Sequence, residues 1–78
     1  MAIDITQKEV ETLTLVDSVD TNTIYVGEAK LGASTSDAVW QILKITKTGT
    51  ITSILSANGN LRFNNKWTER TSKSYSWL

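Results

Sequence analysis

Three polar residues near the end of the first predicted strand carry side chains that could do chemistry. Asp17 and Asp20 lie three residues apart and Asn22 adds an amide oxygen, so the group could bind calcium or act as an acid and a base. The spacing is not that of an EF-hand loop, and Asp and Asn also favour turns. The chain has no His and no Cys. The sequence therefore predicts no catalytic residue, metal site, cofactor or small-molecule ligand, and indicates that the protein is not an enzyme.

Cationic and aromatic side chains are interleaved in the last third of the chain, as they are in proteins that stack single-stranded nucleic acid on aromatic rings. The series is Arg62, Phe63, Lys66, Trp67, Arg70, Lys73, Tyr75 and Trp77. A small single-stranded nucleic-acid-binding β-barrel is thus the alternative function, carried by Arg62, Lys66, Trp67, Arg70 and Lys73. Against it, the chain has no net charge, and Trp40, Phe63 and Trp67 are the large side chains available for a small core. Core packing is the favoured role of these rings.

The charges divide the chain into two halves of opposite sign. Residues 1–37 carry seven carboxylates against two lysines, a balance of −5, whereas residues 38–78 carry six cations against Glu69, a balance of +5. Acidic strands could lie beside basic strands within one fold, because antiparallel neighbours favour opposite charges. Alternatively, the acidic surface of one copy could contact the basic surface of the next. The charge pattern leaves both interpretations open.

Alternating patterns predict strands on both sides of a long loop. Residues 10–17 alternate and predict a first strand, and residues 23–26 predict a second strand that ends at Gly27. The segment 27–38 is then a loop, either a plain crossover or the binding loop of an adhesion module. Residues 71–77 alternate again and predict a final strand at a sheet edge.

Residues 39–65 predict a three-stranded antiparallel meander. Asn58-Gly59 is typical of a two-residue type I′ turn, and the three residues ending at Gly49 suit a hairpin loop with a bulge, which places Ile45 opposite Ile51. One face of the meander then carries Trp40, Ile42, Ile54, Leu61 and Phe63. The other carries Val39, Leu43, Ile45, Ile51, Leu55 and Ala57. Both faces are apolar, and a one-residue slip would exchange them and leave both apolar.

The predicted fold is all-β: a small antiparallel β-sandwich or partly open barrel of five to six strands, forming a single domain over residues 1–78 with residues 1–9 as an N-terminal arm. We expect the N-terminal hairpin to cover the Trp40 face. At 78 residues, with no disulfide, a core of this size needs oligomerisation to be stable. The predicted subunit interface contains Val39, Leu43, Ile45, Ile51, Leu55, Tyr75 and Trp77. No apolar stretch is long enough for a membrane span, and no signal peptide is expected.

Several motifs follow one another along most of the chain: YVGEA from Tyr25, a Gly/Ser/Thr loop, W-x-I-x-x-I from Trp40 and F-x-N-x-W-x-x-R from Phe63. The matching positions are Tyr25, Gly27, Glu28, Ala29, Thr35, Ser36, Trp40, Ile42, Ile45, Gly59, Phe63, Asn65, Trp67 and Arg70. In this order they resemble a recurrent kind of small protein encoded by tailed bacteriophages. The resemblance covers Ile24 to Arg70 and implies a viral setting.

Together, the resemblance and the two apolar faces predict a non-enzymatic virion structural protein, such as a capsid decoration, head-fibre or tail accessory subunit. Its expected partners are other copies of itself and other virion proteins, with neither membrane nor nucleic acid as a partner. Its expected location is the virion, after synthesis in the host cytoplasm. Repetition of weak contacts would make such an assembly stable.

Overall fold

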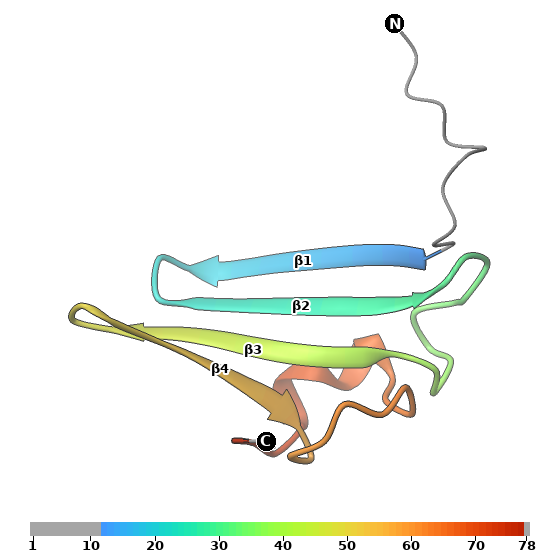
Figure 1. Ribbon diagram of the computed structural model, residues 1–78. Coiled ribbons are helices and arrows are strands. Elements are labelled where there is room, and N and C mark those ends of the chain that lie inside the picture. The colour runs from blue at the N-terminus through green and yellow to red at the C-terminus, as the bar shows by residue number, and fades with distance from the viewer. Residues whose placement is uncertain (1–11, 78) are drawn as a thin grey trace, which may run out of the picture.

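The computed structural model describes residues 12–77 and shows one five-stranded antiparallel sheet (Figure 1). The strands follow the chain order and are joined to one short 3₁₀ helix. The elements are β1 (Thr12–Asp20), β2 (Thr23–Lys30), β3 (Gln41–Thr48), β4 (Ile51–Ala57), η2 (Trp67–Ser72) and β5 (Tyr75–Ser76). The all-β prediction is confirmed, although the strands form a single open sheet rather than two packed sheets. The predicted arm at residues 1–9 lies outside the described residues.

The β1–β2 hairpin extends the sheet edge-on instead of packing over one of its faces. Val16 pairs with Val26, and the register shifts at a bulge between Ser18 and Asp20. The Asp20 carboxylate then accepts a hydrogen bond from the backbone N–H of Asn22 at 2.7 Å. Asp20 and Asn22 thus help to form the turn between β1 and β2. The prediction that this hairpin covers the Trp40 face is therefore wrong, because β2 continues its own sheet by pairing with β3.

Strand β2 runs through Gly27 to Lys30, so the prediction that it ends at this glycine is wrong. Gly27 instead lets an aromatic ring approach the strand backbone. A Cβ atom at this position would lie 2.5 Å from Cε3 of Trp67 and 3.2 Å from Cε3 of Trp40. The missing side chain thus creates the space into which Trp67 packs.

Replacing Gly27 with Ala should lower the free energy of unfolding by about 1–3 kcal/mol, because the added methyl group overpacks the site. Urea unfolding followed by tryptophan fluorescence would measure this change. In a Trp67→Leu background the same substitution should cost less, since the ring that it meets is gone. An equal cost in both backgrounds would contradict this explanation.

The β3–β4 turn sets a register three residues away from the predicted one. Gly49 and Thr50 form a two-residue turn, with Thr48 paired to Ile51 and Gly49 at a φ of 62°. A positive φ at the first central residue is the glycine signature of a type II′ turn. Ile45 consequently lies opposite Ile54 rather than Ile51. Because the shift is odd, every β4 side chain lies on the face opposite to its predicted one.

The Asn58-Gly59 turn has the predicted conformation, with φ values of 59° and 70°, but no strand follows it. Asparagine side chains bond the backbone and each other there and so compete with strand pairing. Asn60 accepts a hydrogen bond from the N–H of Arg62 at 2.9 Å, and the Asn58 amide donates to that of Asn65 at 3.0 Å. The outer edge of β4 pairs instead with β5. The third strand of the predicted meander is therefore absent from the described chain.

The core lies on one face of the sheet, which we call the covered face. Its buried apolar residues are Tyr25, Ala29, Trp40, Ile42, Ala57 and Trp67. The C-terminal segment, orange to red in Figure 1, supplies the cover. The ring centroids of Trp40 and Trp67 are 5.9 Å apart, and those of Tyr25 and Tyr75 are 5.7 Å apart. Thus the C-terminal segment, and not the N-terminal hairpin, buries Trp40 and Ile42.

Candidate subunit interface

The opposite side of the sheet, which we call the open face, carries two adjacent rows of aliphatic side chains. The pairings of β1 to β4 place these residues on the same face: Val16, Val26 and Leu43 in one row, and Ile24, Ile45 and Ile54 in the next. None of the six is buried. Val16 and Ile54 are 61% and 55% exposed. Four strands therefore present a continuous apolar surface to water.

Polar residues border this apolar surface at both ends of the strands. Glu28 is paired with Gln41 at one end, and Lys47 is paired with Thr52 at the other. An apolar centre with a polar rim is the usual anatomy of a protein–protein contact. The open face therefore has the composition of a surface on which another subunit packs.

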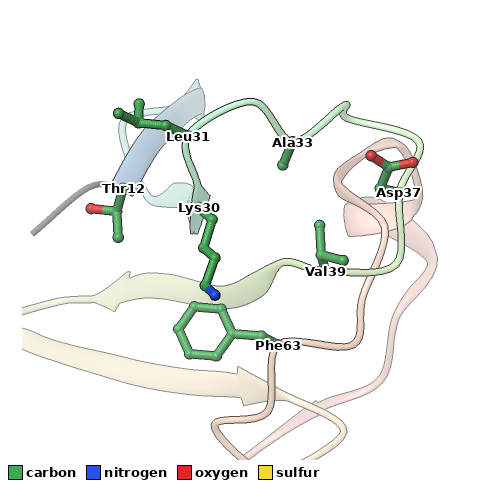
Figure 2. Close-up of a pocket in the computed structure, with 7 residues that line it drawn as sticks. All are labelled: Thr12, Lys30, Leu31, Ala33, Asp37, Val39 and Phe63. Atoms are coloured by element: carbon green, nitrogen blue, oxygen red, sulfur yellow. The ribbon is translucent and has the colours of Figure 1, made fainter.

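A cleft of about 670 Å³ continues the open face beyond Glu28. Thr12 and Lys30, a cross-strand pair of this face, belong to its wall, and Figure 2 shows the Lys30 side chain directed toward the Phe63 ring. Its full lining is Thr12, Lys30, Leu31, Ala33, Asp37, Val39 and Phe63. Leu31, Val39 and Phe63 are all exposed. The apolar surface thus extends from the strands onto two loops.

A tight turn in the loop after β2 fixes one wall of the cleft. The N–H of Ser34 donates to Asp37 Oδ2 at 2.9 Å, and the N–H of Asp37 donates to the Ser34 carbonyl at 3.0 Å. The indole Nε1 of Trp40 donates to that same Ser34 carbonyl at 2.9 Å. Since Trp40 is fully buried, the loop is attached directly to the core. In the described structure the loop connects β2 to β3, and these hydrogen bonds hold this wall in place.

The predicted interface residues are divided between the two faces. Leu43 and Ile45 lie on the open face, and Val39 lines the cleft beside it. Ile51 and Leu55 lie toward the covered face instead, because of the register shift. Tyr75 packs in the core and Trp77 is exposed. The prediction missed Val16, Ile24, Val26 and Ile54, although the alternation of β2 already places Ile24 and Val26 on one face.

Tyr75 is partly buried and packs against the core of its own chain. Its hydroxyl donates to the Arg70 carbonyl at 2.7 Å, and the Lys44 ammonium lies 5.8 Å from the centroids of the Tyr75 and Tyr25 rings. Burial raises the pKa of Tyr75 to about 12; the neighbouring Tyr25 acts in the same direction and Arg70 opposes them. The folded chain therefore favours the neutral phenol.

This raised pKa predicts a loss of stability in alkali. The Tyr75 phenol has an ordinary pKa of 10.0 when the chain is unfolded and a pKa of about 12 when it is folded. Its contribution to the free energy of unfolding is therefore complete below pH 10 and is lost as the pH rises toward 12. Urea unfolding across this range should show a steeper decline for the unmodified chain than for Tyr75→Phe, which lacks the titrating group. Parallel declines in the two proteins would contradict the assignment.

The residues of the nucleic-acid alternative do not line one exposed groove. Trp67 is only 7% exposed, and the Arg70 guanidinium lies 4.7 Å from the centroid of its ring. Arg70 also pairs with Asp17 at 2.9 Å, and Lys73 pairs with Glu69 at 3.5 Å. Arg62 and Lys66 are exposed. The ring predicted to stack on bases is thus part of the core.

The Arg70–Asp17 pair also bears on the division of charge along the chain. These residues are 53 positions apart, one in the acidic half and one in the basic half. Their contact shows that the two halves meet within one fold at this point. For this pair, the interpretation of acidic strands beside a basic segment is the correct one.

Comparison of the chain with protein-family models, with curated proteins and with solved structures gave no match. Within residues 12–77, no helix has the length and apolar character needed to cross a membrane.

Proposed function

We propose that this chain is a non-enzymatic structural protein of a bacteriophage virion, such as a capsid decoration, head-fibre or tail accessory subunit. The open face is the observation that carries the proposal. Its six aliphatic side chains come from four strands, and none is buried. Exposed apolar patches of this kind on small proteins mark contact surfaces. The motif resemblance to tailed-phage proteins supports the viral setting.

The size of the open face suits a contact that is weak singly and strong when repeated. Fully burying a Val, Leu or Ile side chain contributes about 1.5–3 kcal/mol, and the six residues are already partly covered. Association costs about 4–15 kcal/mol in lost freedom of motion, so little net affinity remains for one pair of subunits. Many copies on a common lattice add their contacts together. Other copies of the chain and neighbouring virion proteins are thus the partners that we propose.

Quantitative mass spectrometry of purified phage particles would test the virion role. We expect the chain at a fixed copy number per particle, retained after nuclease treatment and a high-salt wash. Retention under these conditions reflects apolar contact, which salt does not screen. Absence from particles, or release by nuclease, would contradict the proposal.

A further inference from the structure

The outer edge of β1 is the longest free strand edge in the described chain. The strand has nine residues, and among residues 12–77 it pairs only with β2. A free edge presents unpaired N–H and C=O groups, which soluble proteins usually protect with lysine, proline or a bulge. β1 contains neither Lys nor Pro, and its one bulge, between Ser18 and Asp20, lies at the end of the strand. Within the described chain the stretch Thr12–Ser18 is regular and has no second strand partner, and Asp17 is its one charged residue.

The opposite edge of the sheet is partly occupied. β5 pairs with β4 at Ser56 and Ala57, so an incoming strand could reach only the first part of β4. A head-to-tail arrangement, with β1 of one copy beside β4 of another, would therefore form a short ladder. Pairing β1 with its own counterpart uses the longer edge twice. The longer ladder favours association of like edges.

We propose that β1 pairs antiparallel with β1 of a second copy, about a twofold axis at Val16. This register places Val16 opposite its counterpart, and Thr14 opposite Ser18. Val16 is 61% exposed, and directly opposed residues share a face with Cβ atoms about 4.5–5.5 Å apart. The pairing would thus cover the aliphatic side chain at the edge of the open face.

The acidic residue near the centre of this ladder does not oppose the pairing. Asp17 lies on the covered face, opposite Leu15 of the second copy, and its carboxylate is 2.9 Å from Nε of Arg70 in its own chain. Each copy therefore brings its own counter-ion. The twofold axis is perpendicular to the sheet, so both open faces lie on the same side. The pair would present a doubled aliphatic surface to further subunits, which deepens the proposed function without depending on the viral setting.

A single cysteine at the proposed axis tests this contact, because the chain has no cysteine of its own. Under mild oxidation of dilute protein, Val16→Cys should lose most of its monomer to a disulfide-linked dimer. Val19→Cys is the matched control, an equally small exposed residue at the bulge. Equal rates of cross-linking in the two variants would overturn the proposal.

A second variant separates the strand-edge contact from contact through the open face. Val16→Cys combined with Ile54→Lys should still form the disulfide, because Ile54 lies on β4, away from the proposed axis. Loss of the cross-link in this double variant would assign it to the open face and overturn the edge pairing. In the unmodified chain, amide hydrogen exchange within Thr12–Ser18 should slow as concentration rises. Unchanged exchange in an assembled sample would also overturn it.

Discussion

Trp67→Ala is expected to lower the free energy of unfolding by about 3–5 kcal/mol, the usual cost of removing a buried tryptophan side chain. The Trp67 ring packs against the backbone of Gly27, and its centroid lies 5.9 Å from the centroid of the Trp40 ring. It also carries the Arg70 guanidinium on its face. A single core in a chain of this size rarely supplies more than about 3–5 kcal/mol of stability. A large fraction of the molecules is therefore expected to be unfolded in this variant, as urea titration or circular dichroism would show.

Trp77→Ala is the matched control, since it removes the same side chain from a position that is 67% exposed. Its effect on unfolding should stay within about 0.5 kcal/mol, as for most surface substitutions. Both variants must be measured at one protein concentration, because association raises apparent stability. Similar losses for the two tryptophans would contradict the assignment of Trp67 to the core.

Ile54→Lys is expected to abolish association through the open face. Ile54 is 55% exposed and lies in the same row as Ile24 and Ile45. Another subunit packed there would have to bury an ammonium group among aliphatic side chains, at a cost far above the weak net affinity of the contact. Sedimentation velocity should therefore show loss of every species larger than the β1-paired dimer.

Ile51→Lys makes the same chemical change on the same strand, at a position that is 67% exposed. Ile51 lies toward the covered face, so its substitution should leave the assembly intact. The pair of variants compares the two faces of β4 directly. If Ile51→Lys disrupted assembly as strongly as Ile54→Lys, the contact would not be specific to the open face.

The register of β4 shows why the strands were predictable and their faces were not. The segment from Ile51 to Leu55 has aliphatic residues at both odd and even positions, so either face looks apolar from the sequence. The loop length before it decides the matter, and a glycine at position 49 is compatible with both a two-residue and a three-residue hairpin. In the structure its φ of 62° belongs to the shorter turn. The local pattern therefore predicted the strand, while a single turn determined the face of the sheet on which each of its side chains lies.

The C-terminal part shows a different limit of prediction. Asn58-Gly59 has the conformation expected from its residue types, but the side-chain amides of Asn58, Asn60 and Asn65 lead the chain away from β4. These bonds link residues across the loop, so no periodic pattern reveals them. The role of Gly27 was hidden for the same reason. Its meaning depends on Trp67, which lies 40 positions later in the sequence.

The candidate site was predicted in part because an uncovered apolar face follows from the small size of the chain. Leu43 and Ile45 lie on the open face, whereas Ile51 and Leu55 lie toward the other. Tyr75 and Trp77 were predicted as interface residues from the alternation of residues 71–77 alone. In the structure, tertiary contacts pack Tyr75 against the core. The need for a partner could thus be inferred from the sequence, but the set of contacting residues required the register.

Sedimentation velocity of the unmodified chain over a wide concentration range tests the central claim most directly, namely that another subunit covers the open face. We predict that the average mass rises with concentration beyond that of a dimer. We also predict that the rise persists at high salt, since burial of aliphatic side chains drives it. A single monomeric species at every concentration would contradict the claim.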